Sequence, residues 1–388
     1  MTAYDDAVAG WYTHLHGGGT DTWARWLNAD RSEPAVSAPR TTAVQLELVR
    51  RLGELGELPR FGALAEAVVA TPAFGRGSLE MPLPWPEAPT YGPRAVPPED
   101  LPAGELLRVA APVLARLVPR LPEAPPRPAP AGGRWWRRAV TVTGPPALAG
   151  PLRRQLLAAG LRDRSRNATR IVLAAPFEQA MFGLWSVRVA EGASVRWSRF
   201  WQIRSRADRV PPAFNAARLA RLAPGPHDRT HLVIAADRDL VVRTVAELSG
   251  VAVDLPPSPE WAEVDLRRRL NRVVEATTDP PRRAALGARL AALLREHPEC
   301  SSGSGGSGES VAPPRAERAW AVATGIRLAD DVASLVATGG YPVHGNPADL
   351  LGAPDPGVDA PVTTTAERTL HLALVAVRAA WAQLEGGR

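Results

Sequence analysis

The stretch A-V-T-V-T-G at residues 139–144, followed by P-P-A-L-A-G-P-L-R-R-Q-L-L-A-A-G at 145–160, decides the fold. Its first part is short and rich in β-branched residues, as a buried strand requires. Its second part has helical character and stops at Gly160, a residue typical of helix ends. Together the two parts predict a strand, a glycine turn and a helix.

The chain beyond this unit repeats the alternation. Nearly continuous apolar runs of strand length recur, and helical segments stand between them. Such runs are typical of a parallel sheet with both faces covered. We therefore predict an α/β fold, a parallel sheet with covering helices, joined to a mainly helical N-terminal region. The further predicted strands are 170–175, 184–190 and 230–236, and the predicted helices after the first unit are 213–223, 238–249, 260–276, 281–297, 315–338 and 364–384.

The N-terminal third has a different character. Residues 41–55 place Val44, Leu48, Leu52 and Leu55 at spacings of four, four and three, the apolar stripe of a core-facing helix. Residues 71–102 then contain nine prolines, before a second helix begins near Gly104. We expect a helical N-terminal region at 1–70, a proline-rich connector with one helix at 71–134, an α/β core at 135–300, a flexible Gly/Ser loop at 301–310, and a C-terminal helical part of the core at 311–388.

Composition excludes several chemistries. The 388 residues carry a formal net charge of +6, yet the chain has no lysine, so every basic side chain is arginine or histidine. This excludes a Walker A loop, a pyridoxal phosphate Schiff base and a lysine nucleophile, because guanidinium cannot replace a compact or deprotonatable amine. The single cysteine, Cys300, excludes intrachain disulfides and cysteine-rich metal sites.

Charge and hydropathy also suggest a compartment and partners. The acidic N-terminus lacks the basic and apolar regions of a secretory signal, and no apolar run approaches the roughly 18 residues of a membrane span. We expect a cytoplasmic protein without a membrane span. We do not expect a nucleic-acid partner, because a charge of +6 over this length is modest unless it gathers on one face.

The turn Thr143-Gly144-Pro145-Pro146 is the main candidate site. In an open α/β sheet, ligands lie outside the carboxyl ends of strands, and a helix N-terminus there attracts anions. The two prolines lack an N–H, however, and proline simply starting a helix after a turn is the alternative.

Two stretches rich in arginine and tryptophan have two interpretations. R-W-W-R-R at 134–138 and R-W-S-R-F-W at 196–201 combine cationic forks with flat indole faces. They suit anion binding or base stacking. We favour the alternative, in which the tryptophans line a core and the arginines extend from it to solvent.

The histidines give weaker signals. His14 and His16 form an H-x-H pair without an adjacent carboxylate cluster, so we predict no metal site. His344, in the glycine-rich turn G-G-Y-P-V-H-G-N-P, is a weak candidate general base whose partner the sequence does not identify. The similar segments 46–52 and 264–270, both with Arg-Arg after an acidic residue, leave open either a duplication or a chance recurrence.

Three motifs carry a resemblance to a known family. They are V-T-V-T-G-P-P-A-L-A-G-P-L-R-R-Q-L at 140–156, T-H-L-V-I-A-A-D at 230–237 with W-A-E-V-D-L-R-R-R-L-N at 261–271, and I-R-L-A-D-D-V-A-S-L-V-A-T-G-G-Y-P-V-H-G-N-P-A-D-L-L at 326–351. Residues 136–382 thereby resemble the actinobacterial sulfotransferase-like proteins, a branch of the nucleotide-dependent sulfotransferase superfamily. The resemblance implies a P-loop sulfotransferase-like core and transfer of a sulfuryl group from phosphoadenosine phosphosulfate to a hydroxyl.

The sequence departs from this family at the phosphosulfate loop. Where the family has Pro-Lys-x-Gly-Thr-Thr, residues 145–150 read Pro-Pro-Ala-Leu-Ala-Gly, without the amine or the hydroxyls. Thr143, Gly144, Arg153 and Arg154 are the remaining candidates for binding the cofactor. We predict a catalytically degenerate protein that keeps a surface for an anionic nucleotide or a partner. Two alternatives stay open: an active transferase in which arginine replaces the loop lysine, and a non-enzymatic protein that binds another protein through its N-terminal region.

Overall fold

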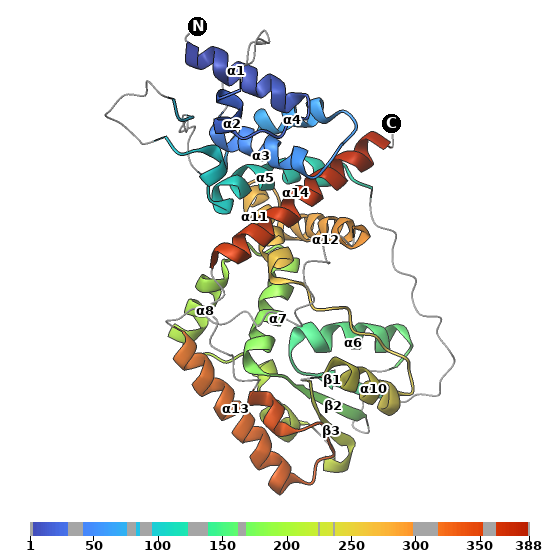
Figure 1. Cartoon of the computed structure of the whole chain (residues 1–388). Helices are drawn as coiled ribbons and strands as arrows, with labels where there is room; N and C mark the ends of the chain where they lie inside the picture. The colour runs from blue at the N-terminus through green and yellow to red at the C-terminus, as the bar shows by residue number, and fades with distance from the viewer. Residues whose placement is uncertain are drawn as a thin grey trace.

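The structure is a computed structural model of the chain, and it shows two lobes, one above the other in Figure 1. The R-W-W-R-R stretch, Cys300 and the predicted Gly/Ser loop lie outside the described residues. The described residues are 3–29, 42–75, 83–85, 95–122, 139–161, 168–223, 226–235, 237–297, 317–351 and 362–386.

The lower lobe contains a parallel sheet of four strands within the described residues, which confirms the α/β class. The strands lie in the order in which they occur in the chain, so β1 and β4 are its edges. The predicted strands near 139–144, 170–175 and 230–236 are therefore confirmed, and β4 is an addition. The strands are β1 Val140–Thr143, β2 Thr169–Ala174, β3 Thr230–Ile234 and β4 Val343–His344.

Helices cover both faces of this sheet. Val142, Leu173 and Val233 point to one face and pack against α6 (Pro146–Ala158) and α10 (Arg238–Ser249). The alternate side chains, including Val172 and Leu232, pack on the other face against α9 (Ala216–Leu222) and α13 (Arg318–Gly339). This two-sided burial explains the nearly continuous apolar runs of β2 and β3.

One predicted strand is wrong. Residues 184–190 belong to the helix α7 (Phe177–Ala190), and α8 (Trp197–Arg206) follows it. Both helices contribute to a cluster of aromatic rings, in which Trp185 packs tilted on Trp197 at a centroid distance of 5.3 Å. A helix buried on most sides carries apolar residues nearly all round, so over seven residues its pattern is the same as that of a buried strand.

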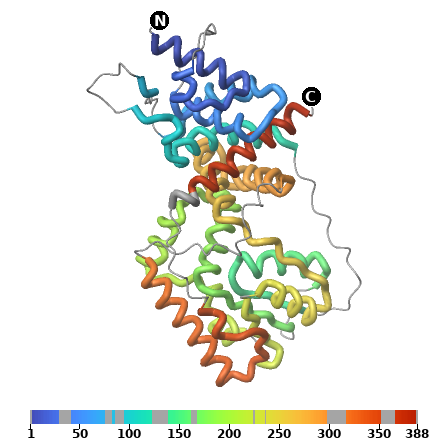
Figure 2. Tube along the Cα trace, in the orientation of Figure 1, coloured from blue at the N-terminus to red at the C-terminus, as the bar shows by residue number. Residues whose placement is uncertain are grey.

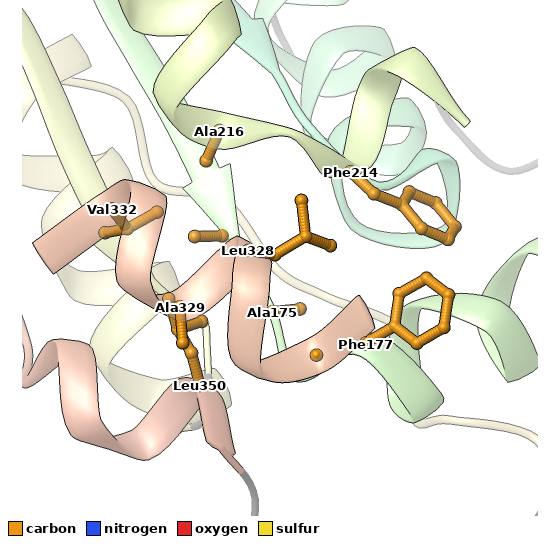
Figure 3. Close-up of a pocket in the computed structure, with 10 residues that line it drawn as sticks. Ala175, Phe177, Phe214, Ala216, Leu328, Ala329, Val332 and Leu350 are labelled. Carbon is orange, nitrogen blue, oxygen red and sulfur yellow. The ribbon is translucent and has the colours of Figure 1, made fainter. Parts of the chain in front are cut away.

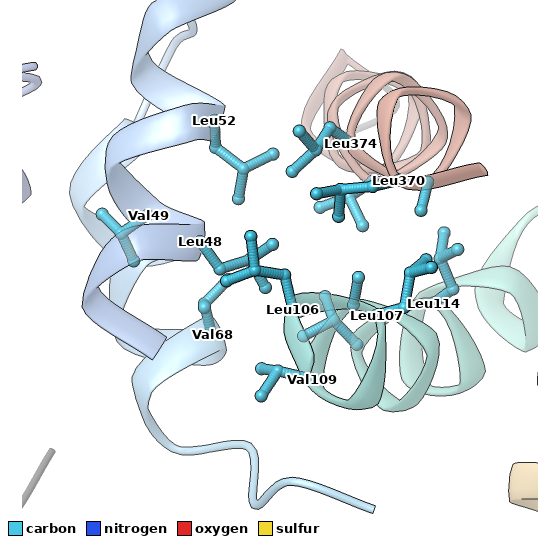
Figure 4. Close-up of a cluster of buried hydrophobic side chains, with 14 of the residues drawn as sticks. Leu48, Val49, Leu52, Val68, Leu106, Leu107, Val109, Leu114, Leu370 and Leu374 are labelled. Carbon is cyan, nitrogen blue, oxygen red and sulfur yellow. The ribbon is translucent and has the colours of Figure 1, made fainter. Parts of the chain in front are cut away.

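The upper lobe is helical and is assembled from three separate parts of the chain (Figure 1). The first and last segments of the trace meet there, as the blue and red tubes in Figure 2 show. Its core includes Leu48 of α3, Leu107 of α5 and Leu370 of α14, which converge in Figure 4. The helices with residues in this core are α1 Ala3–His16, α2 Trp23–Leu27, α3 Ala43–Glu54, α4 Phe61–Val69, α5 Ala103–Leu117, α11 Trp261–Val274, α12 Pro280–Glu296 and α14 Val362–Gly386.

The lobes therefore cut across the predicted domain boundaries. We expected 135–300 and 311–388 to form one α/β core, but α11, α12 and α14 pack in the core of the helical lobe. Of the last segment, β4 joins the sheet, and α13 and the short helix Pro347–Leu351 pack against it. An amphipathic stripe shows that a helix has a buried face and does not show which core that face enters. Asn271 of α11 joins the lobes, because its buried amide donates to the carbonyls of Val189 in the last turn of α7 and of Ala193 just after that helix.

The two Arg-Arg segments noted in the sequence form the same arrangement in three dimensions. Glu47 of α3 is fully buried and accepts hydrogen bonds from Arg50 and Arg51. Asp265 of α11 accepts in the same way from the arginines three and four residues later, at 2.7 Å each. Both helices therefore carry a buried carboxylate held between two guanidinium groups.

Candidate functional site

The turn between β1 and α6 packs tightly on the neighbouring strand. Gly144 has a φ of +138°, and a Cβ atom at this position would lie 2.6 Å from the carbonyl oxygen of Leu173 in β2. Only glycine fits such a backbone at such a separation. Thr143 ends the strand, half-buried, immediately before it. The turn leaves no room for a ligand between itself and β2.

The first turn of α6 offers few donors to an anion. Pro145 and Pro146 have no N–H, and the N–H groups of Leu148 and Ala149 both donate to the Pro145 carbonyl oxygen at 3.0 and 2.9 Å. A first turn that binds phosphate usually presents several free N–H groups. Of the N–H groups considered in the first turn of α6, that of Ala147 is the one left for an anion.

The helix start is also covered by a neighbour. The Cβ atom of Ala147 lies against Gly183 of α7, where a side chain larger than hydrogen would approach it to 2.8 Å. Two helices in such close contact leave no space for a nucleotide between them.

The two candidate arginines of α6 do not converge on Gly144. Arg153 donates from Nη2 to the carbonyl oxygen of Val142 at 2.9 Å, so it satisfies the free edge of β1. Arg154 is exposed, and its Nη1 lies near Gly150, one helical turn after the start of α6. The structure therefore brings Thr143 and Gly144 together but places neither guanidinium over them.

Acidic residues occupy the other helix starts at this edge of the sheet. Glu178 lies in the first turn of α7, and Asp237 caps α10 by accepting from the N–H of Asp239 at 2.9 Å. The neighbouring Arg238 turns away and donates to the carbonyl oxygens of Leu255 and Pro256. Negative charge at a helix N-terminus neutralises the dipole that would otherwise attract an anion.

A pocket opens beside the end of β2 (Figure 3). Phe177 of α7, Phe214 and the α13 side chain of Leu328 line it, with Ala175 and Leu350. All of its lining residues are apolar, so it offers no charged or polar side chain to a nucleotide phosphate or a sulfate ion.

His344 has a partner that the sequence did not reveal. The parallel register of β3 and β4 brings it beside His231, with 3.1 Å between Nε2 of His344 and Nδ1 of His231. The ring centroids are 5.4 Å apart, which is the nitrogen separation plus two ring radii, so the nitrogens face each other directly. Such a linear pair shares one proton in an N–H···N hydrogen bond.

The surroundings of His231 favour its neutral form. Burial lowers the pKa of His231, the neighbouring His344 lowers it further, and Asp228 opposes the shift. His227 stands nearby in sequence but stacks on Tyr341 and bonds the Gly339 carbonyl instead. The pair couples β3 to β4 and has no carboxylate partner bonded to either ring among the described residues.

The described residues contain no group of three or more histidine, cysteine, aspartate or glutamate side chains that could hold a metal ion. His14 pairs with Asp21 at 3.1 Å, and His16 pairs with Glu66 at 3.3 Å, so the H-x-H residues have separate partners.

In the part of the chain that the structure covers, no helix is both long enough and apolar enough to cross a bilayer.

The R-W-S-R-F-W stretch packs as we favoured. Trp197, Phe200 and Trp201 are buried in the aromatic cluster of the lower lobe, and Trp201 is in edge contact with Trp320 of α13. Its arginines Arg196 and Arg199 are exposed. The indoles therefore offer no stacking surface.

The fold and the site together define a class: a two-lobed protein with a parallel α/β sheet whose carboxyl edge is closed and acidic. Comparison of the chain with protein-family models, with curated proteins and with solved structures gave no significant match.

Proposed function

We propose that the chain is a sulfotransferase-like protein without the transferase reaction, and that it acts by binding a partner. The three motifs behind the family resemblance support this relationship by their positions. The first forms β1 and α6, the second β3 and most of α11, and the third the second half of α13 with β4, so the resemblance follows the lower lobe and the helix that leaves it.

One observation carries the loss of the reaction: among the described residues, the carboxyl edge of the sheet presents acidic and proline-capped helix starts and no converging cation. A departing sulfuryl group develops negative charge, which a transferase stabilises with preorganised donors. Losing even one such donor typically costs about 3 to 4 kcal/mol in the transition state. Here the amine, the hydroxyls and most N–H donors are missing together.

The active alternative requires arginine to replace the lysine. Arg154 is the better placed of the two arginines, because its guanidinium extends toward the start of α6, whereas Arg153 already bonds the edge of β1. Even so, Arg154 reaches only Gly150, and a planar fork is a poor substitute for a compact ammonium group.

The N-terminal connector is a less suitable partner surface than we expected. In its described part, Leu83 is buried and its N–H donates to the Tyr4 hydroxyl at 3.0 Å, while Trp23 donates to the Pro84 carbonyl. These groups already bind the protein's own helical lobe. A partner would have to displace them.

Calorimetric titration of the full chain with adenosine 3′,5′-bisphosphate tests the proposal. We expect no saturable heat for the parent chain, and the same for Arg153→Gln and Arg154→Gln. Stoichiometric binding by the parent would overturn the closed edge of the sheet, and a weakening of at least tenfold in Arg154→Gln would locate the nucleotide at the start of α6. Thermal unfolding of each variant confirms that the sample is folded.

A further inference from the structure

The segment around α8 is strongly basic. Residues 195–210 contain five arginines and one aspartate, a formal charge of +4, while the whole chain carries +6. Charge influences a partner when it gathers on one surface rather than averaging out over the molecule. α8 lies at the outer margin of the lower lobe, at the left in Figure 1.

The helical spacing sorts α8 into two faces. Trp197, Phe200 and Trp201 point into the aromatic cluster. Arg196, Arg199, Ile203 and Arg206 follow one another at spacings of three, four and three, and all four are exposed. We call these four residues the α8 arginine face; over ten residues it extends for about 15 Å.

No carboxylate neutralises this face within the described residues. Arg199 donates to the uncharged amide of Gln202 at 2.6 Å, and Arg204 beside it lies 5.6 Å from the centroid of the Phe200 ring. Asp208, the acid within the same segment, accepts from the indole of Trp320. Arg196 stands close enough to Arg268 of α11 to repel its charge. None of these arginines forms an ion pair within the described residues.

We propose that the α8 arginine face docks this protein on an anionic membrane surface. This inference names the partner for the binding role proposed above and rests on that role. Guanidinium groups, always charged, pair with lipid phosphates. Ile203, 48% exposed in the middle of the face, and the adjacent Val195, 39% exposed, would leave water at the headgroup boundary.

Two features separate a lipid surface from nucleic acid. The aromatic rings that would stack on bases are buried, so the face has no stacking platform. Contact of the exposed aliphatic side chains with a phosphate backbone contributes no binding free energy, whereas their contact with the apolar boundary of a bilayer is favourable. Because the apolar face of α8 is used in the protein core, docking is peripheral, reversible and sensitive to salt.

Co-sedimentation with vesicles tests the proposal on the full chain. We expect binding to an equal mixture of phosphatidylglycerol and phosphatidylcholine, little binding to phosphatidylcholine alone, and a marked decrease at high salt. Each basic residue near an anionic surface contributes about fivefold to partitioning. The triple variant R196Q/R199Q/R206Q should therefore bind about 100-fold more weakly.

A matched variant controls for net charge. Arg120, Arg243 and Arg282 are exposed arginines on three other elements, and no side-chain ion pair is present at any of them in the described structure. R120Q/R243Q/R282Q removes the same charge, and we expect it to retain most of the binding. Ile203→Ser should weaken vesicle binding severalfold without altering the salt dependence.

Three results would overturn the docking proposal: no binding to anionic vesicles, equal loss in both triple variants, or arginine-dependent binding to duplex DNA in place of vesicles. None of these results depends on the nucleotide titration. Docking can therefore fail while the chain remains a protein without transferase activity, and nucleotide binding can be found whether or not vesicles are bound.

Discussion

Substituting Gly144 with alanine tests how closely the β1–α6 turn packs on β2. The added methyl group would have to occupy a position 2.6 Å from the Leu173 carbonyl oxygen, on a backbone with φ of +138°. Such a backbone conformation costs a non-glycine residue about 1 to 3 kcal/mol. Forcing an extra methyl into a packed contact costs about 1 to 3 kcal/mol more. We therefore expect Gly144→Ala to lower the free energy of unfolding by about 3 to 4 kcal/mol.

Gly160, at the other end of α6, supplies the matched control. Its φ is +83°, and a Cβ atom there would meet nothing within 4 Å. Gly160→Ala therefore carries the backbone cost without the collision, and we expect a loss of about 1 kcal/mol. Urea unfolding with linear extrapolation measures both variants. Equal losses for the two substitutions would refute the close packing of the turn, and with it the closure of this edge of the sheet.

Three further predictions concern buried polar groups. Glu47→Gln should lower the free energy of unfolding, measured in urea, by about 3 to 5 kcal/mol, because it leaves two guanidinium groups without a buried counter-charge. The exposed Glu191→Gln should change this free energy by under about 1 kcal/mol. Similar losses in the two variants would contradict the role of Glu47 as a buried counter-charge. Because the pKa of His231 is lowered in the folded chain, the unfolded chain binds more protons below about pH 6.5. The free energy of unfolding should therefore fall as the pH drops below that value, and it should fall less in His231→Gln. The same pH profile in parent and variant would count against a lowered pKa of His231. Asn271→Ala should cost about 2 kcal/mol, because it removes both buried side-chain hydrogen bonds and leaves only the Val189 carbonyl with another donor, the N–H of Gly192. A thermal unfolding temperature equal to that of the parent would exclude this link between the lobes.

Local sequence patterns predicted most elements of the fold. The strands at 139–144, 170–175 and 230–236 and the helices after them depend on periodicity and on glycine or proline punctuation, which act over a few residues. The strand predicted at 184–190 was wrong because a deeply buried helix lacks the polar face that distinguishes a helical pattern from that of a buried strand. Its aromatic neighbours come from distant parts of the chain, so no local signal marked them.

The lobe organisation and the closure of the sheet edge depend on tertiary contacts. An apolar stripe on 364–384 predicted a buried helix, yet its partners α3, α5 and α11 had no signature in that stretch. The prolines of the β1–α6 turn did indicate a poor anion site. The capping role of Asp237 and the diversion of Arg153 to the Val142 carbonyl became visible only with the fold. The pairing of His231 with His344 likewise follows from the strand register.

The most direct test of the central claim is a transfer assay with radiolabelled phosphoadenosine phosphosulfate and the full chain, offered a panel of hydroxyl compounds. The closed, acidic edge of the sheet predicts that the donor is consumed no faster with the protein than without it. Protein-dependent transfer of the label that disappears in Arg154→Gln would contradict the account.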